Sequence, residues 1–289
     1  MVPGGPAVVA LGSRANPKSI YLYNKTHGLL SPVIVQFFNY LKQVLTFHLG
    51  TSITYSAPVW TLIRSALSHT VVLVTVALVL QFVIAIPLGA FQAQRRNSRF
   101  DYIATGTTFV LYSIPVFLIG EFMITLFAIQ LHWLPGLVSQ TASAWAVFTS
   151  PLQFLMPIFT LTFLGIGGLS RYQRSSMVEV LAQDYIRTAR AKGLSERLVV
   201  RRHALRNSVL PIITIIGLSL PALVGGALIT EYLFDIPGMG SLTLQAATTQ
   251  DMPVVVGTTI VATAFTIVGS IVADLLYAVA DPRIRTQGR

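Results

Sequence analysis

Hydrophobic residues gather in long runs along this chain, and short polar or basic segments separate the runs. A helix needs about 20 apolar residues to cross the ~30 Å hydrocarbon core of a bilayer. Five runs are long enough: 70–91, 103–130, 152–170, 208–230 and 254–280. Prolines within them are tolerable, because neighbouring membrane helices can satisfy the freed backbone groups. The pattern predicts an all-α polytopic membrane protein with five spans, and we interpret 70–289 as its transmembrane domain.

A further helical pattern, between Leu30 and Leu45, is one-sided. Its apolar stripe is Leu30, Val33, Ile34, Phe37, Phe38, Leu41, Val44 and Leu45. The opposite side carries Gln36, Asn39, Lys42, Gln43 and Thr46. Such a stripe favours a helix that lies on the membrane surface over one that crosses the membrane. We interpret 1–69 as an N-terminal segment that contains this amphipathic helix.

The charges fix a predicted orientation. Only 10% of the residues are charged, against roughly 25% in soluble domains. Lys and Arg are concentrated in 92–101, 171–207 and 281–289, whereas the loops 131–151 and 231–251 contain neither. The positive-inside rule then places the C-terminus in the cytoplasm and the N-terminal segment outside. We attribute the net charge of +10 to this topology and not to nucleic-acid binding.

The residue types that carry catalysis are missing or scattered. There is no cysteine, no G-x-x-x-x-G-K-[ST] phosphate loop and no G-x-S-x-G serine motif. The five histidines have no metal-ligand spacing. We therefore predict no catalytic residue, no metal site and no cofactor bound by this chain.

The basic segment 171–207 predicts a helical elbow. Ser176 and Glu179 have the spacing of a capping box, so we expect a helix to begin there and to continue through Lys192. Gly193 falls where a left-handed residue ends a helix, and Ser195 can cap the next one. Two interpretations are open: a basic loop that only fixes topology, or a rigid elbow that transmits force from a soluble partner into the membrane.

Several separated motifs resemble one family. The segment SRYQRSSMVEVLAQDYIRTARAKGLSERLVVRRHALRNSVLP is similar to the cytoplasmic signature of the inner-membrane permeases of binding-protein-dependent ABC transporters, most closely the B-type subunit of dipeptide/oligopeptide importers. PGGPA (3–7), HLGTSITYSAPV (48–59), EYLFDIPGMGSL (231–242) and LLYAVADPRIR (275–285) resemble the same family in the same order. At Arg187-Thr188 the chain departs from the general Glu-Ala of the signature and looks like the peptide subgroup.

The resemblance implies the helical bundle of a type I ABC importer permease. The chain would form half of the translocation pathway for di- or oligopeptides in a bacterial plasma (inner) membrane. Its implied partners are a second homologous permease, as a heterodimer, two cytoplasmic ABC ATPase subunits that hold ATP and Mg, and an extracytoplasmic substrate-binding protein. The family has six spans and its first would precede PGGPA, so we expect that span to be missing from the five predicted here.

The resemblance also assigns roles to residues. The coupling helix that docks on an ATPase would comprise Asp184, Tyr185, Arg187, Thr188, Ala189, Arg190, Ala191, Lys192, Gly193 and Leu194. An outer loop that reaches toward the binding protein or the pore mouth would contain Glu231, Phe234, Pro237, Gly238 and Gly240.

Two acidic residues, Glu121 and Asp274, fall at membrane depth, where charge is costly. Glu121 either lines the translocation pathway or makes a helix contact, and Asp274 could pair with Arg283 or Arg285. Small residues at 164–170, 223–228 and 257–265 predict close helix packing, within the chain or against a second permease. The alternative function is a secondary transporter or channel driven by ion gradients.

Overall fold

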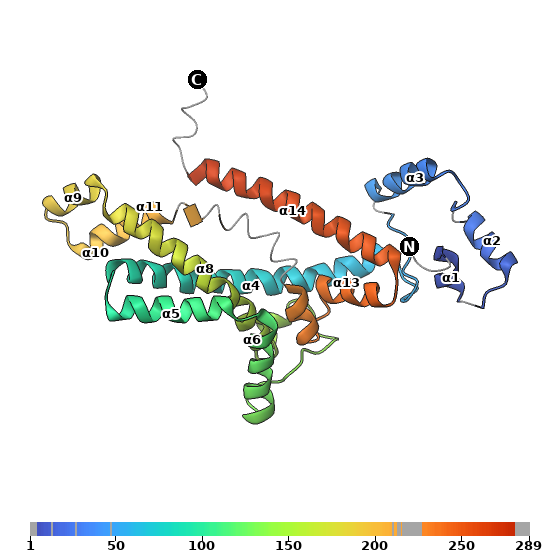
Figure 1. The fold of residues 1–289 in the computed structure, drawn as a ribbon, viewed down its shortest axis with the longest axis horizontal. Coiled ribbons are helices and arrows are strands. Elements are labelled where there is room, and N and C mark those ends of the chain that lie inside the picture. The colour runs from blue at the N-terminus through green and yellow to red at the C-terminus, as the bar shows by residue number, and fades with distance from the viewer. Residues whose placement is uncertain are drawn as a thin grey trace, which may run out of the picture. The chain divides into compact units, whose positions relative to one another are not determined.

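A computed structural model describes residues 5–12, 14–26, 28–46, 48–209, 211–212, 215 and 227–280. The described residues are mainly helical (Figure 1). The helices are α1 (Gly5–Leu11), α2 (Pro17–Thr26), α3 (Val33–Leu45), α4 (Val59–Gln94), α5 (Arg99–Ser113), α6 (Val116–Met123), α7 (Ala146–Thr149), α8 (Leu155–Leu181), α9 (Asp184–Ala191), α10 (Glu196–Leu198), α11 (Leu205–Ser208), α13 (Met239–Thr248) and α14 (Met252–Ala280). Residues 227–233 are also helical. Two π-helical segments, η1 (Ile124–Gln130) and η3 (Val199–Ala204), and one 3-10 turn, η2 (Pro151–Gln153), complete the described elements.

Two helices in the described part of the chain are long and apolar enough to cross a membrane, or three if one bent pair counts as a single span. The two are α4 and the Met252–Val272 part of α14, which confirms the predicted runs 70–91 and 254–280 as helices. α4 begins at Val59, about three turns before the predicted run.

The run 103–130 is not one straight helix. The chain bends by 98° between Arg99–Ser113 and Val116–Gln130. Pro115 stands at this break and cannot donate the backbone hydrogen bond that would continue α5. The predicted run is therefore helical on both sides of a break, and it is a single span only if the bent pair counts as one. The run 208–230 lies largely outside the described residues, as does most of the cluster 223–228.

The chain divides into two compact units. Unit 1 comprises 1–67 and 242–261, and unit 2 comprises 68–241 and 262–289. In unit 1, Leu49, Val59 and Ile63 are buried. The buried Asp251 accepts hydrogen bonds from Ser52 Oγ (2.5 Å) and Thr54 N (3.0 Å). These bonds tie the turn over 51–58 to the residue before α14.

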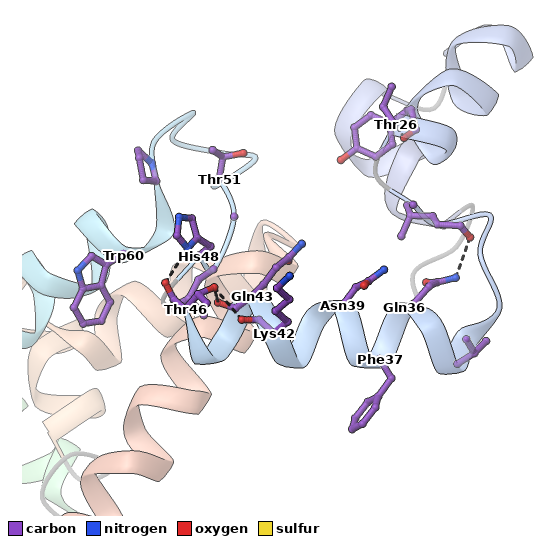
Figure 2. Close-up of a pocket in the computed structure, with 17 residues that line it drawn as sticks. Thr26, Gln36, Phe37, Asn39, Lys42, Gln43, Thr46, His48, Thr51 and Trp60 are labelled. Carbon is purple, nitrogen blue, oxygen red and sulfur yellow. Dashed lines mark hydrogen bonds between the residues drawn. The ribbon is translucent and has the colours of Figure 1, made fainter.

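The amphipathic prediction for 30–45 is confirmed as a helix, α3. The apolar side chains of α3 are largely exposed within this chain (Val33, Ile34, Phe37, Phe38, Leu41 and Leu45), as is Leu30 in the turn before it. A groove of about 1290 Å³ lies in unit 1, between the end of α2, α3 and residues 48–60. The groove is lined in part by polar residues of α3: Gln36, Asn39, Lys42 and Gln43 (Figure 2).

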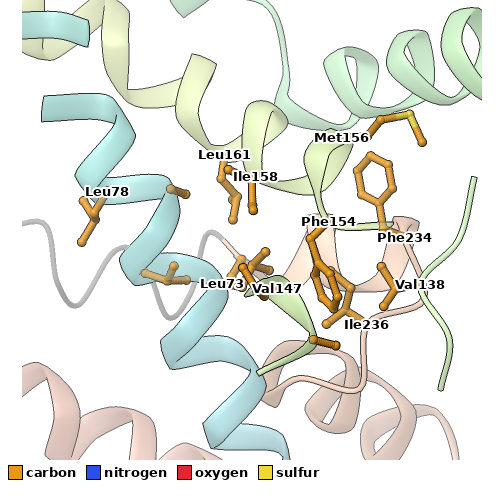
Figure 3. Close-up of a cluster of buried hydrophobic side chains, with 14 residues drawn as sticks. Leu73, Leu78, Val138, Val147, Phe154, Met156, Ile158, Leu161, Phe234 and Ile236 are labelled. Atoms are coloured by element: carbon orange, nitrogen blue, oxygen red, sulfur yellow. The ribbon is translucent and has the colours of Figure 1, made fainter. Parts of the chain in front are cut away.

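The main core belongs to unit 2. Its buried members come from α4, from the segment 138–161 and from the helix end and turn at 227–236 (Figure 3): Leu73, Val74, Ala77, Leu78, Val138, Ala146, Val147, Phe154, Met156, Ile158, Leu161, Ala227, Phe234 and Ile236. The segment 131–151, which lacks basic residues, is thus partly built into this core through Val138 and Val147.

Small residues of 164–170 allow α8 to approach its neighbours. A Cβ placed on Gly167 would lie 2.5 Å from the backbone oxygen of Thr108 in α5, closer than side chains tolerate. A Cβ on Gly165 would overlap the side chain of Gln81 in α4. The cluster therefore serves close packing inside this chain, as small residues do between membrane helices.

Candidate functional site: a helical elbow and a buried turn

The basic segment forms an elbow of two helical arms. The first arm, α9, begins at Asp184 and not at Ser176 as predicted. α8 runs without interruption to Leu181, and α9 begins at Asp184 after Gln183 in extended conformation. Ser176 lies inside α8, where its hydroxyl donates to the backbone oxygen of Ser208 (2.9 Å). The capping-box prediction at Ser176 and Glu179 was wrong, because packing continues α8 past these residues.

The turn of the elbow has the predicted conformation. Gly193 has φ +78°, and a Cβ there would meet no atom within 4 Å. The glycine is needed for its backbone and not for space, since left-handed φ is unfavourable for most side chains. Ser195 precedes α10 in extended conformation, at the predicted N-cap position, but its side chain makes no hydrogen bond there, so it does not provide the predicted cap. η3 and α11 continue the second arm to Ser208.

A small hydrophobic core stiffens the elbow. It joins the end of α4, α8, α9 and η3 through Ala93, Met177, Ile186, Ala189, Val199 and Ala204. Ile186 and Ala189 are three residues apart, so they share one face of α9, and both are buried. Asn207 Nδ2 donates to Tyr185 Oη (3.0 Å) across the two arms. α9 is therefore fixed on its inner face.

The outer face of α9 is exposed in this chain. Of the residues predicted for ATPase docking, those exposed in this chain are Asp184, Tyr185, Arg187, Thr188, Arg190, Ala191, Lys192 and Gly193. Ala189 is buried and Leu194 is partly buried in the elbow core. The predicted set thus divides into an exposed face and two residues that hold the helix in place.

Two ion pairs lie on this face. Arg190 donates to both carboxylate oxygens of Glu196, at 3.0 and 2.7 Å, and so bridges the Gly193 turn. The hydrogen bond from Arg190 holds the pKa of Glu196 below its usual value. Arg187 contacts Asp184 more loosely, at 3.4 Å. Both pairs are exposed, so each contributes little to stability.

The motif at 231–242, which was predicted to form an outer loop, is mostly buried, and the sequence did not predict this burial. Phe234 and Glu231 are 1% and 0% exposed, and Gly238 and Gly240 are also buried; Pro237 is intermediate. The four buried residues cannot reach a partner in this conformation of the chain. Tyr232 is 62% exposed, whereas the other residues of 231–242 are buried or intermediate.

The carboxylate of Glu231 organises this turn. It accepts hydrogen bonds from Thr70 Oγ1 (2.5 Å), Gly240 N (2.7 Å) and Ser241 N (3.2 Å). Gly240 and Ser241 are in the first turn of α13, whose backbone amides have no helical acceptor, so Glu231 caps α13 from a distance. Burial raises the pKa of Glu231, although the hydrogen bonds and the charge interaction with His69 oppose the rise.

The two remaining predictions for acidic residues differ in outcome. Glu121 is exposed on α6 and makes no ion pair with the described residues. Asp274 lies in α14, but its side chain and the predicted partners Arg283 and Arg285 are outside what the structure describes. No group of three or more His, Asp or Glu side chains that could hold a metal occurs among the described residues.

Comparisons with known proteins agree with this architecture. Residues 85–286 match the family model of the binding-protein-dependent transport system inner membrane component. The oligopeptide transport system permease protein AppB of Bacillus subtilis (strain 168) is 37% identical over 98% of this chain and 90% of the relative. The dipeptide transport system permease protein DppB of Alkalihalophilus pseudofirmus is 34% identical over 99% of this chain and 91% of the relative.

A solved structure has a similar fold. An inward facing conformation of the MetNI methionine ABC transporter matches with a TM-score of 0.58 and 18% identity, over 75% of this chain and 96% of that chain. At this identity the likeness concerns the fold alone, which is that of an ABC importer permease. The family match and the extent of the relatives together identify the chain: it belongs to the family of binding-protein-dependent transport system inner membrane components.

Proposed function

We propose that this permease carries di- or oligopeptides inward as one half of an ATP-driven importer. Membership of the transport family and the peptide-permease relatives over nearly the whole chain support the substrate class. The comparisons favour this reading over a gradient-driven secondary transporter or channel. The partners would be a second homologous permease, two cytoplasmic ATPases that hold ATP and Mg, and an extracytoplasmic binding protein in a bacterial inner membrane, with the C-terminus in the cytoplasm.

The observation that carries the mechanism is the two-faced helix α9. Its inner face is packed by Ile186 and Ala189, and its outer face is free of contacts with the elbow core. An ATPase that binds the outer face would move α9, and the elbow core would pass that movement to α8 and α4. Closing the ATPases would then switch the bundle between outward- and inward-facing states, a movement of packed helices against one another. In this proposal the chain couples the ATPases to the membrane helices and forms part of the peptide pathway, while the partner subunits hydrolyse ATP.

Glu121 belongs to the proposal as a pathway residue. It is a carboxylate exposed on an apolar helix of the bent pair, and an exposed charge at membrane depth is stable only beside water, a cation or another subunit. It would therefore face the second permease or the pathway, where it could meet a peptide amino group. Unchanged peptide uptake by Glu121→Gln would remove this role.

The turn at Gly193 offers a direct test of docking. The tagged chain is co-expressed with the second permease and both ATPases, and the ATPase retained on purification is measured. Gly193→Val should insert in the membrane but retain far less ATPase, because a β-branched residue is strained at φ +78°. Gly193→Asn is the matched control, since asparagine tolerates left-handed φ, and it should retain near wild-type amounts. Equal ATPase retention by Gly193→Val and wild type would contradict the coupling role.

A further inference from the structure

An ion pair between a buried carboxylate and a partly exposed guanidinium joins α5 to α8. Arg174 Nε and Nη2 donate to the two carboxylate oxygens of Asp101, each at 2.7 Å. The side chain of Asp101 is 3% exposed and that of Arg174 is 29% exposed. Two parallel charge-assisted hydrogen bonds fix both distance and direction, so this pair is stiffer than an ordinary surface contact.

Asp101 also holds the turn between α4 and α5. Its carboxylate accepts from Asn97 N (3.0 Å), and its own backbone amide donates to Ser98 Oγ (3.2 Å). Asn97 has left-handed backbone, with φ 64°. One carboxylate thus connects Arg174 of α8 to the turn that links α4 with α5. The hydrogen bond from Arg174 lowers the pKa of Asp101, so the pair stays charged at neutral pH.

The pair lies one helical turn from the elbow core. Arg174 precedes Met177 by three residues on α8, and Met177 is fully buried with Ile186 and Ala189 of α9. A displacement of α9 reaches α8 through these side chains. From α8 it reaches α4 and α5 through apolar packing, which can slide, and through the directional Asp101–Arg174 pair.

We propose that Asp101 and Arg174 are positioning residues that pass the movement of the elbow to the α4–α5 turn, and so couple ATP hydrolysis to transport. The proposal rests on the proposed function, since it needs an ATPase on α9. A pair that only stabilised the fold would affect yield and assembly. It would not change the amount of peptide transported for each ATP hydrolysed by the complex that does assemble.

The test uses the whole transporter in liposomes: this chain, the second permease, both ATPases and the binding protein. Uptake of a radiolabelled tripeptide and ATP hydrolysis are measured on the same preparations. Asp101→Asn should retain the ATPases and hydrolyse ATP, while the uptake per ATP falls by about tenfold. Arg174→Lys keeps the charge but loses the planar fork, and should give a smaller fall. Arg99→Gln removes an exposed charge two residues from Asp101 and should leave the ratio unchanged.

The reversed pair gives the sharpest outcome. Asp101→Arg combined with Arg174→Asp restores an ion pair between the helices, and it should regain part of the uptake per ATP that Asp101→Asn loses. The proposal is overturned if Asp101→Asn and Arg174→Lys both keep the wild-type ratio, or if the reversed pair does no better than Asp101→Asn. Should Asp101→Asn fail to assemble, Arg174→Lys decides alone. Failure of the wild-type chain to retain any ATPase would instead refute the proposed function itself.

Discussion

The elbow and the turn at 231–241, called the outer turn after its predicted place, are both built around tight turns, but they use their polar groups in opposite ways. The elbow turns its charged side chains outward and keeps only a small apolar core inside. The outer turn buries its carboxylate, Glu231, and binds it with a hydroxyl and two backbone amides. The elbow is thus suited to meeting a partner, whereas the buried residues of the outer turn shape the chain itself.

The same contrast separates the two buried carboxylates. Asp101 meets the guanidinium of Arg174, which favours its charged form and lowers its pKa. Glu231 is almost fully removed from water and receives neutral donors, so burial dominates and its pKa is raised. A carboxylate can therefore link two helices or cap one helix, depending on the groups that donate hydrogen bonds to it. The following predictions test this difference, from the largest expected effect to the smallest.

The largest effect should come from Gly240→Ala in the outer turn. A Cβ there would overlap the Cα of Leu228 and come close to the Glu231 carboxylate, so backbone must move. We expect the free energy of unfolding to fall by about 3 kcal/mol, a cost typical of overpacking. Gly106→Ala in α5 is the matched control, since a Cβ there meets nothing within 4 Å and alanine favours a helix. Thermal unfolding of the purified chain in detergent measures both; equal melting temperatures would contradict the account of the turn.

Glu231→Gln should destabilise the outer turn by about 2 kcal/mol, because the amide cannot accept from all three donors and leaves one buried group unpaired. The loss should be local, with earlier hydrogen exchange at Gly240 and Ser241, whose amides Glu231 accepts. Glu121→Gln, at an exposed site, is the comparison and should leave the unfolding temperature unchanged. Unaltered exchange at the start of α13 in Glu231→Gln would show that the carboxylate is not its cap.

The two carboxylates should give stability opposite pH dependences. The pKa of Glu231 is raised from 4.5, so its contribution is complete below 4.5 and is lost as pH rises through the raised value. The pKa of Asp101 is lowered from 3.8, so its contribution is present above 3.8 and is lost as pH falls through the lowered value. In a pH series, Glu231→Gln should reduce the fall in melting temperature that occurs as pH rises above 4.5. Asp101→Asn should reduce the fall in melting temperature that occurs as pH drops below 3.8. If Glu231→Gln altered the acid side alone, the assignment would be reversed.

The smallest effect should come from the exposed pair at the elbow. Glu196→Gln removes the bridge from Arg190 across the Gly193 turn, but both side chains are largely in water, at 42% and 60% exposure. We expect less than about 1 kcal/mol, and less still at high salt. Melting temperatures at low and high salt measure it. A loss as large as that of Glu231→Gln would mean that the elbow, like the outer turn, depends on its polar contacts.

Local patterns in the sequence predicted the parts of the fold that neighbouring residues determine. The apolar runs predicted α4 and α14, the stripe at 30–45 predicted α3, and the glycine at 193 predicted a left-handed turn. Local reasoning failed where packing overrides it. Ser176 has a capping spacing, yet α8 continues past it because Met177 is buried in the elbow core.

Contacts between distant residues account for what the sequence could not predict. Glu231 and Thr70 are 161 residues apart, and Arg174 and Asp101 are 73 apart. An acidic residue in a segment with a Pro-Gly turn is typical of an exposed loop, so the burial of Glu231 had no local signal. The break in the run 103–130 did have one, Pro115, although membrane helices often tolerate proline.

The central claim is that the outer face of α9 binds a cytoplasmic ATPase, and site-specific crosslinking tests it most directly. The chain contains no cysteine, so a single Thr188→Cys on the exposed face of α9 can carry a short photoactivatable crosslinker in the assembled transporter. A second chain with Tyr232→Cys, exposed in the outer motif, serves as the comparison. We predict that the label at 188 crosslinks to an ATPase subunit and that the label at 232 does not. Crosslinking to the ATPase from 232, or none from 188 in a complex that hydrolyses ATP and takes up peptide, would contradict the account.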